Sequence, residues 1–216
     1  MNPLSTITWA QALREPSYRM QLLLTMVLLI ACALIAPVLF EWIEQRPGYR
    51  MDDPLLAILP ATDLSVIIFS LLYLLIITGI VMLAKKPVQF LFALQAFLHV
   101  TILRFTTLLL VPLEAPNGIK LLRDPFIEVL FYQQPITKDL FFSGHTGTLI
   151  LLYLLFRTHD LFKWVYLSGA IVVSVLILIQ HAHYTIDVVM APVFVWVAFR
   201  VAQWYPKNFS VNNSKD

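Results

Sequence analysis

The chain has 216 residues, of which 59% are hydrophobic and only 13% are charged, and its mean hydropathy is +0.79. Since soluble domains carry roughly a quarter charged residues, this composition argues against a soluble protein and indicates a membrane protein. The net charge of +2 comes without a basic cluster among aromatic residues, which argues against a nucleic-acid partner, and one cysteine, Cys32, excludes an intramolecular disulfide.

Six apolar segments are predicted to cross the bilayer as helices, because its hydrocarbon core needs about 20 residues of helix. They are residues 20–40, 64–84, 87–111, 140–156, 164–180 and 184–202. The tight "KKP" link between the second and third segments predicts an antiparallel hairpin. We therefore expect an all-α integral membrane protein that folds as a bundle of six transmembrane helices.

Lysine and arginine residues between the spans predict the orientation of the chain. If the N-terminus is cytoplasmic, the inner segments hold Arg14, Arg19, Lys85, Lys86, Arg157, Lys163, Arg200, Lys207 and Lys215. The outer loops then hold Arg46, Arg50, Lys120, Arg123 and Lys138. This bias predicts that both termini are cytoplasmic. The compact size favours a bacterial inner membrane with the outer face toward the periplasm, or a lumenal face in a eukaryote.

Two polar stretches interrupt the apolar pattern, "FFSGHTGTL" at 141–149 and "HAHYTIDVV" at 181–189. In the predicted topology the fourth and sixth spans both begin at the outer face, so His145, His183 and Asp187 should lie at one depth. Arg104 lies about 10 Å below the outer end of the third span. An arginine at that depth is costly on the lipid face, so it is expected to point into the bundle and meet an anion.

These residue types suit chemistry at phosphorus. His183 and Asp187 are four residues apart and share one helix face, so the carboxylate can fix the imidazole tautomer and leave the other nitrogen as a base or nucleophile. His145 could supply a second acid–base group from another helix. The candidates for binding a substrate phosphate are Arg104, Ser143, Gly144 and Thr146. The sequence contains no G-x-S-x-G elbow, P-loop or dinucleotide-binding fingerprint.

Other interpretations of the same residues remain open at this point. The two histidines of "HAH" and Asp187 could ligate a metal ion, although Arg104 nearby would repel a cation. Polar residues within spans can also hold helices together. His181 faces away from His183 if a helix has already begun there, which favours a supporting or loop role.

The stretches "KDLFFSGHTGTLILLYL" and "HAHYTIDVVMA" resemble two catalytic motifs of the sphingomyelin synthase family, within the type 2 phosphatidic acid phosphatase superfamily. The matching positions are Asp139, Ser143, Gly144, His145, Thr146, His181, His183, Tyr184, Thr185, Asp187 and Val188. Residues 103–113, with Arg104, and residues 53–63 resemble further family segments more weakly. The sequence departs from the phosphatase branch, since it contains neither the K-x6-R-P motif nor the arginine that usually precedes the second histidine. We expect it to differ from the animal synthases in being short, without their extended N-terminal domain.

The resemblance implies a six-span bundle with an outward-facing or lumenal site. It also implies roles for three residues: His183 as the nucleophile that forms a phosphorylated intermediate, Asp187 as the residue that orients it, and His145 as the acid–base group. Supporting roles are assigned to Asp139, His181, Tyr184, Arg46 and Arg50. No metal ion or other cofactor is expected, since Arg104, helped by Arg46 or Arg50, would stabilise the developing charge.

The leading expectation is a lipid phosphotransferase that moves a phosphorylated headgroup from a phospholipid to a lipid alcohol, either ceramide or diacylglycerol. The first alternative is a lipid phosphate phosphatase with water as acceptor, and the second is an inactive transporter or scaffold on the same fold. The expected organisation is an N-terminal cytoplasmic segment at 1–18, one catalytic membrane domain at 19–203 and a polar C-terminal tail at 204–216.

Overall fold

The computed structural model describes residues 7–124 and 136–206, so Lys207, Lys215 and most of the predicted tail lie outside it. The helices in chain order are α1 (Trp9–Arg14), α2 (Pro16–Gln45), α3 (Pro54–Ile58), α4 (Ser65–Leu83), α5 (Pro87–Leu110), α7 (Gly144–Phe156), α8 (Phe162–Ile179) and α9 (Thr185–Ala202). Within those two ranges there is no strand, only an isolated bridge between Tyr49 and Leu113. The fold is an all-α integral membrane bundle, as predicted.

Five of these helices, α2, α4, α5, α8 and α9, are long and apolar enough to cross a membrane. The remaining predicted span is shorter than expected, because helix α7 begins at Gly144 and has only 13 residues. It is therefore about 20 Å long, against a hydrocarbon core of about 30 Å. The non-helical residues before it, 140–143, are mostly buried within the bundle. Irregular backbone at membrane depth is tolerated when protein covers it.

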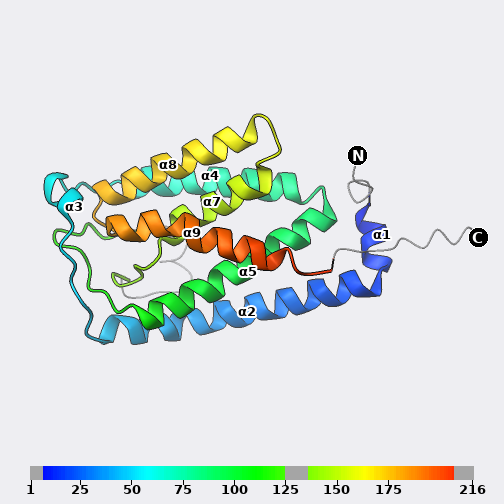
Figure 1. Ribbon diagram of the computed structural model, residues 1–216, viewed down its shortest axis with the longest axis horizontal. Coiled ribbons are helices and arrows are strands. Elements are labelled where there is room, and N and C mark those ends of the chain that lie inside the picture. Colours follow the sequence, from blue (N-terminus) through cyan, green and yellow to red (C-terminus); the bar gives the residue numbers. More distant parts are fainter. Residues whose placement is uncertain (1–6, 125–135, 207–216) are drawn as a thin grey trace, which may run out of the picture.

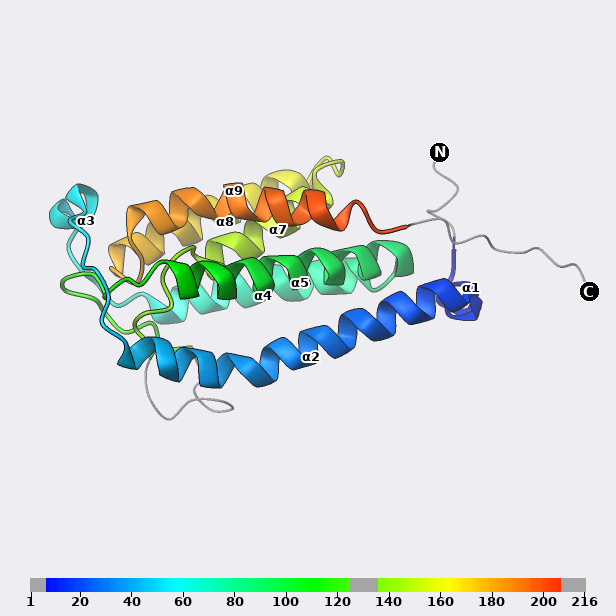
Figure 2. The same cartoon turned by 60° about the horizontal axis from the view of Figure 1, so that its bottom comes forward.

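Helix α7 lies at the centre of the bundle and packs against α8 and α9 (Figure 1). Helix α5 packs against α9 on one side and α2 on the other, and α4 packs against α8. Helix α2 runs along the edge of the bundle and leaves most of its length exposed to lipid (Figure 2). Polar groups at the start of α7 are thus surrounded by neighbouring helices and not by lipid.

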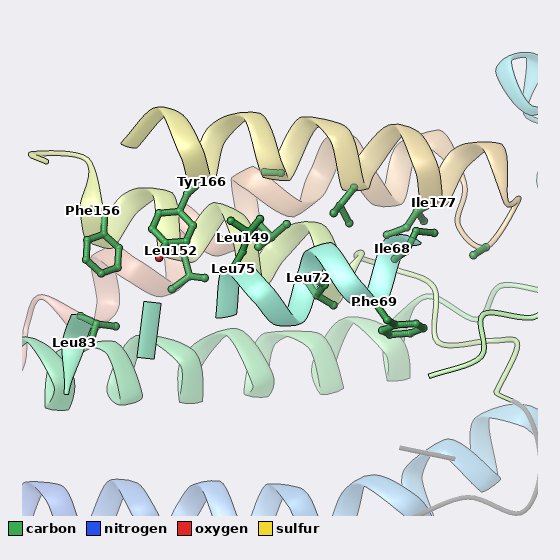
Figure 3. Close-up of a cluster of buried hydrophobic side chains, with 13 residues drawn as sticks. Ile68, Phe69, Leu72, Leu75, Leu83, Leu149, Leu152, Phe156, Tyr166 and Ile177 are labelled. Carbon is green, nitrogen blue, oxygen red and sulfur yellow. The ribbon is translucent and has the colours of Figure 1, made fainter. Parts of the chain in front are cut away.

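The largest apolar cluster joins α4, α7 and α8 (Figure 3). Its labelled members are Ile68, Phe69, Leu72, Leu75, Leu83, Leu149, Leu152, Phe156, Tyr166 and Ile177. Helices α4 and α8 approach each other closely at Gly169 of α8, where a Cβ atom would lie 2.4 Å from Cδ1 of Leu75 on α4. Small residues permit such close approach of membrane helices, so this contact fixes α8 against α4.

The two ends of the bundle differ in what they carry. Helix α1 and the last turn of α9 lie at one end, whereas α3 and the loops that precede α7 and α9 lie at the other (Figures 1 and 2). The predicted hairpin is present, since only residues 84–86 separate α4 from α5. The indole of Trp9 donates to the carbonyl of Ala84 at 2.6 Å, and the hydroxyl of Tyr18 donates to that of Pro87 at 3.0 Å. The N-terminal helices are therefore attached to this hairpin, at the end opposite the polar loops.

Candidate active site

The two polar stretches of the sequence come together at the loop-rich end of the bundle. His145 lies in the first turn of α7, and His183 lies two residues before α9 begins. Their ring centroids are 6.2 Å apart with the ring planes at 67°. The backbone N–H of Ser143 donates to the carbonyl of Asp187 at 3.1 Å, which joins the two stretches directly. A single phosphate group between the histidines could therefore contact both rings.

Asp187 orients the ring of His183. Nδ1 of His183 lies 3.3 Å from Oδ2 of Asp187, and the same oxygen accepts the backbone N–H of Tyr184 at 2.9 Å. His183 is 2% exposed and Asp187 is fully buried. The carboxylate occupies Nδ1, so Nε2 is the nitrogen of His183 that remains for a substrate.

His145 packs edge-on against Phe69, with ring centroids 5.6 Å apart. Within residues 7–124 and 136–206, Nδ1 of His145 and Oδ1 of Asp187 are buried and have no hydrogen-bond partner. Buried polar atoms are nearly always hydrogen-bonded, and exceptions concentrate at catalytic positions. An imidazole held mainly by apolar contacts keeps its nitrogens for proton transfer.

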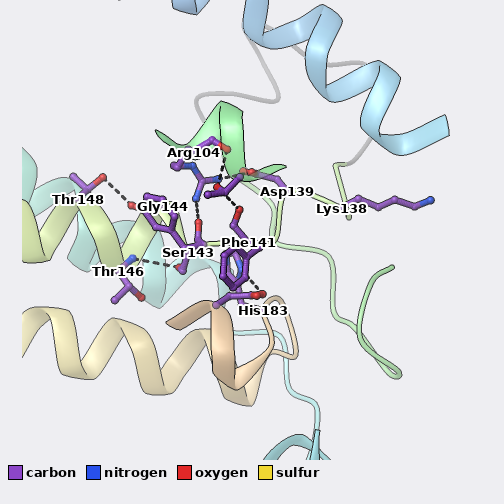
Figure 4. A network of polar contacts seen from close by, with 12 residues as sticks. Arg104, Lys138, Asp139, Phe141, Ser143, Gly144, Thr146, Thr148 and His183 are labelled. Atoms are coloured by element: carbon purple, nitrogen blue, oxygen red, sulfur yellow. Dashed lines mark hydrogen bonds and ion pairs between the residues drawn. The ribbon is translucent and has the colours of Figure 1, made fainter. Parts of the chain in front are cut away.

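The guanidinium of Arg104 enters the same site from α5. It donates to the side chain of Asp139 and to the backbone carbonyl of Phe142 (Figure 4). The Cζ atom of Arg104 also lies 5.8 Å from the ring centroid of Phe142. The arginine thus meets an anion inside the bundle, where its depth in the membrane would otherwise make it costly.

Gly144 gives the guanidinium its room. A Cβ atom at this position would lie 2.8 Å from both Cζ and Nη1 of Arg104. A contact this short would displace the arginine or the first turn of α7. The glycine of the motif is therefore required by the approach of Arg104 to the helix backbone.

These groups line one cavity of about 450 Å³. Its polar part includes Arg104, Asp139, Gly144, His145 and His183. Its apolar part is lined mainly by Phe40, Phe69, Leu72, Ile76, Phe97, Val100, Phe105, Ile119, Leu122 and Ile136. Phe97 lies seven residues before Arg104 along α5, so the apolar part extends about 10 Å along the helix from the guanidinium. The cavity therefore joins a polar end to a hydrophobic part that is lined by residues of α2, α4 and α5.

A second cavity of about 510 Å³ lies on the other side of residues 181–184. Asp52, Asp53, His181 and Tyr184 line it, but His145, His183 and Arg104 do not. It lacks the pair of facing histidines, so the 450 Å³ cavity is the better candidate for catalysis although it is the smaller one.

Two residues expected to bind phosphate, Ser143 and Thr146, lie outside the 450 Å³ cavity, which is the candidate catalytic cavity. Ser143 is fully buried and caps α7, where its hydroxyl accepts the backbone N–H of Thr146 at 3.4 Å. The hydroxyl of Thr146 lies 3.0 Å from that of Ser174 on α8. Thr148, which neither polar motif indicates as a site residue, lines the cavity and donates to the carbonyl of Gly144 at 2.9 Å. The N-terminal part of α7 thus presents Gly144, His145 and Thr148 to the cavity, while Ser143 and Thr146 hold the helix in place.

His181 and Tyr184 hold loops together. The ring nitrogens of His181 lie 2.9 Å from the carbonyl of Asn117 and 3.1 Å from that of Leu59. The hydroxyl of Tyr184 donates to the carbonyl of Glu114 at 2.9 Å. His181 and His183 therefore have different surroundings, and in the part of the chain that the structure describes no group of three His, Cys, Asp or Glu side chains could hold a metal ion.

Arg46 and Arg50, which were expected to assist with charge, do not line the catalytic cavity. The guanidinium of Arg46 donates to the carbonyls of Leu108 and Leu109, at the C-terminal end of α5. A cation at this position complements the helix dipole. Arg50 is exposed in the loop that follows α2. Arg46 thus fixes α2 to α5.

Two further polar contacts at the cavity carry little signal in the sequence. The hydroxyl of Thr107 donates to the carbonyls of Phe141 at 2.9 Å and Arg104 at 3.0 Å. Its spacing of three residues from Arg104 places both on one face of α5, which is the only clue to its position. Tyr73 donates to the carboxylate of Asp124, with distances of 2.6 and 2.7 Å to its two oxygens. Tyr73 and Asp124 line the cavity, whereas Thr107 does not.

Residues 138–205 match the family described as "PAP2 superfamily C-terminal". The matched range contains α7, α8 and α9 together with both polar stretches. This match covers less than half of the chain, and it shows that this part of the chain is similar to the PAP2 superfamily, whose members are usually phosphatases or phosphotransferases acting on lipid phosphates. No curated protein matches the chain as a relative.

Proposed function

We propose that the chain is a member of the PAP2 superfamily and acts as a phosphotransferase that moves a phosphorylated headgroup from a phospholipid to a lipid alcohol, either ceramide or diacylglycerol. The observation that carries the proposal is the single cavity in which His145, His183 and Arg104 surround the polar end of an apolar channel. The resemblance of both histidine motifs to those of sphingomyelin synthases supports a transferase within the superfamily.

In the first step, Nε2 of His183 attacks phosphorus and the bond from phosphorus to the diacylglycerol oxygen breaks. Protonated His145 gives its proton to the departing oxygen, which leaves as an alcohol. The phosphohistidine carries positive charge on its ring, and the carboxylate of Asp187 beside Nδ1 stabilises it. His183 is the nucleophile in this scheme because it alone of the two histidines has a carboxylate on its second nitrogen.

In the second step, neutral His145 takes the proton from the incoming hydroxyl group as its oxygen attacks the phosphohistidine. The bond from phosphorus to Nε2 breaks, and both histidines return to their starting states. Arg104 lies beside both stages and can donate two N–H groups to the phosphoryl oxygens, whose negative charge increases in the transition state. Asp139 holds the guanidinium in position through its ion pair.

The apolar part of the cavity favours a membrane lipid over a soluble phosphate ester. Phe40, Phe97 and Phe105 belong to α2 and α5, and they line the channel that leads away from Arg104. Apolar walls of this kind stabilise an acyl chain through burial, at about 25 cal/mol for each Å² removed from water.

A lipid phosphate phosphatase is the second candidate, favoured by the superfamily match, whose members include many hydrolases. The same phosphohistidine serves both reactions, and they differ only in whether an alcohol or water attacks it. Sealing of the cavity by the lipid acceptor would favour the transferase, because water must be kept from the intermediate.

The proposal is tested with purified protein and phosphatidylcholine or phosphatidylethanolamine labelled in the headgroup, with and without ceramide or diacylglycerol. We expect a labelled lipid product only when the alcohol is present, and we expect it to form in the presence of a metal chelator. Release of water-soluble phosphate from phosphatidic acid would assign the phosphatase reaction instead. If neither reaction occurs with any of these lipids, the proposed function is wrong.

A further inference from the structure

The last turn of α2 ends in a carboxylate that binds the loop leading to the active site. Oε1 of Glu44 accepts the backbone N–H groups of Thr137 at 2.5 Å and Lys138 at 2.6 Å, and Oε2 accepts the hydroxyl of Thr137 at 2.9 Å. Three donors from two consecutive residues fix both the position and the direction of this stretch of backbone. Hydrogen bonds to a charged acceptor are the stronger kind.

The residue that follows this stretch is Asp139, the ion-pair partner of Arg104. Glu44 is not among the residues that line the catalytic cavity, whereas Thr137, Asp139 and Arg104 are. Glu44 can therefore influence a substrate only through the backbone of residues 137–138 and the carboxylate of Asp139. The chain of contacts is short and continuous, from Glu44 through Asp139 to the guanidinium.

The outer end of α2 is itself held in place. Arg46 donates to the last carbonyls of α5, and Ile43 is almost fully buried. Nζ of Lys138 donates to the carbonyl of Arg46 at 2.8 Å and to Glu114 at 2.9 Å. This end of α2 thus gives Glu44 a fixed point from which to hold the loop, although most of α2 faces lipid.

We propose that Glu44 is a positioning residue, which holds Asp139 in the orientation that directs Arg104 at the phosphate of the substrate. The inference rests on the proposed function, because it concerns the group that stabilises charge on phosphorus. It assigns to α2 a part in catalysis that neither its sequence nor its place at the edge of the bundle indicates. Loss of the hydrogen bonds would release residues 137–139, and the guanidinium would lose its alignment.

The first test compares steady-state lipid turnover in Glu44→Ala, Glu44→Gln and Glu41→Ala. We expect Glu44→Ala to lower kcat about tenfold with little change in KM, because misalignment weakens contacts made in the transition state. Glu44→Gln should retain most of the activity, since the amide oxygen can accept both backbone N–H groups while the amide nitrogen donates to Thr137. Glu41 is exposed on the same helix, and its replacement should leave turnover unchanged.

A double-mutant cycle tests whether Glu44 acts through Asp139. In an Asp139→Asn background the ion pair to Arg104 is already weakened, so adding Glu44→Ala should lower kcat by much less than tenfold. Two residues that act independently would instead give effects that multiply. Full multiplication in the double variant, or normal kcat in Glu44→Ala, would overturn the inference.

Binding of orthovanadate, which resembles a phosphoryl group in transfer, provides a readout that does not depend on the lipid used. We expect Glu44→Ala to bind vanadate about tenfold more weakly than the wild-type protein, measured by protection against thermal unfolding. If Glu44→Ala does not fold, Glu44→Asp keeps the charge but shortens the side chain and should show a smaller loss of the same kind. If folded Glu44→Ala binds vanadate as tightly as the wild-type protein, the inference about Glu44 is wrong, while the proposed function is unaffected. A wild-type protein that neither turns over lipid nor binds vanadate would overturn the proposed function, and the inference with it.

Discussion

At the scale of single residues, Arg104 has the most demanding geometry. Its guanidinium donates in two directions at once, to Asp139 and to the carbonyl of Phe142, while its edge lines the cavity. A lysine ammonium is a point charge and cannot reproduce the planar, two-pronged contact with phosphate oxygens. We therefore expect Arg104→Lys to lower kcat/KM about 10²-fold, the usual loss when a donor to transition-state charge is removed.

The matched control for this variant is Arg50→Lys, because Arg50 is exposed and lies away from the catalytic cavity. It should turn over lipid at the wild-type rate. Near-normal kcat/KM in Arg104→Lys would remove this arginine from the reaction.

The two histidines should give different results when the phosphorylated intermediate is trapped. His183→Ala removes the proposed nucleophile, so no acid-labile phosphoenzyme should form from labelled substrate. His145→Ala should behave differently with a donor whose leaving group needs no protonation. The first step should then proceed while the second stalls for want of a base, and the phosphoenzyme should accumulate.

The measurement is acid-labile label on the protein after rapid quenching, with wild-type protein as the reference. Label that persists in His183→Ala, or that is found on Ser143, would show that His183 is not the nucleophile. The position of Ser143 also argues against it as the nucleophile, since its hydroxyl is buried and caps α7.

The sequence indicates some of these positions and is silent on others, for physical reasons. His145, His183 and Asp187 are evident because polar groups at membrane depth are costly and need a reason to be there. The roles of Ser143 and Thr146 cannot be inferred in this way, since a hydroxyl group at the start of a helix can cap the helix or face a ligand equally well. Glu44 cannot be identified from the sequence because two of its three donors are backbone N–H groups, which every residue except proline carries, and all three lie far away in the chain.

At the scale of elements, the short helix α3 is connected to the helix that carries Asp187. The carboxylate of Asp53 caps α3 through the N–H groups of Leu55 and Leu56. It also accepts the backbone N–H of Thr185 at 2.7 Å and its hydroxyl at 2.9 Å, in the first turn of α9. One side chain thus organises two helix N-termini, and its loss affects both.

This arrangement predicts a pH-dependent contribution to stability. Burial alone would raise the pKa of Asp53, but the hydrogen bonds from Thr185, Leu56 and Leu55 outweigh it and hold the pKa below its ordinary value of 3.8. A carboxylate with a lowered pKa stabilises the folded state above its unfolded pKa, and the contribution is lost as the pH falls through the folded pKa. We expect Asp53→Ala to cost about 1–2 kcal/mol at pH 7, the value of a helix cap, and progressively less as the pH falls through the lowered pKa of the folded state.

The loss of stability is measured by thermal unfolding of the wild-type protein and of Asp53→Ala in detergent, at neutral and at acid pH. Asp52→Ala is the control, because Asp52 is exposed and next to Asp53 in the chain. The assignment fails if the two variants lose equal stability at pH 7, or if the loss in Asp53→Ala is independent of pH.

The boundaries of α7 show where prediction of elements reaches its limit. Hydropathy predicted a span from residue 140, because Leu140, Phe141 and Phe142 are as apolar as the helix that follows. In the structure, Thr107 and Arg104 bind the carbonyls of Phe141 and Phe142, so these backbone groups are satisfied from α5 without a helix. A hydropathy scale cannot distinguish backbone groups that are hydrogen-bonded within a helix from backbone groups that are hydrogen-bonded by side chains of another helix.

At the scale of the whole molecule, the all-α architecture and the order of the apolar helices follow from hydropathy, although five helices and not six are long enough to cross a membrane. The meeting of the two polar stretches at one end follows from their places in that order. The lateral arrangement of helices does not follow. Membrane helices are apolar on all sides, so the pattern of a helix such as α2 does not show which face contacts α5 and which contacts lipid. The catalytic cavity has a wall from α2 at Phe40, and that wall could not be predicted.

The orientation of the whole bundle is the last prediction, and it follows from the positive-inside rule. Lysine and arginine are more frequent at the end that holds the α4–α5 hairpin, which predicts that this end is cytoplasmic and that the catalytic cavity opens near the outer face. Cysteines introduced at opposite ends of a Cys32→Ser protein can report this. Arg50→Cys lies at the loop-rich end and Lys86→Cys at the hairpin, and both positions are exposed. In sealed right-side-out vesicles, a membrane-impermeant maleimide should label Arg50→Cys at once and Lys86→Cys only after permeabilisation. The reverse pattern would place the site on the cytoplasmic face, and its phospholipid donor would then come from the inner leaflet.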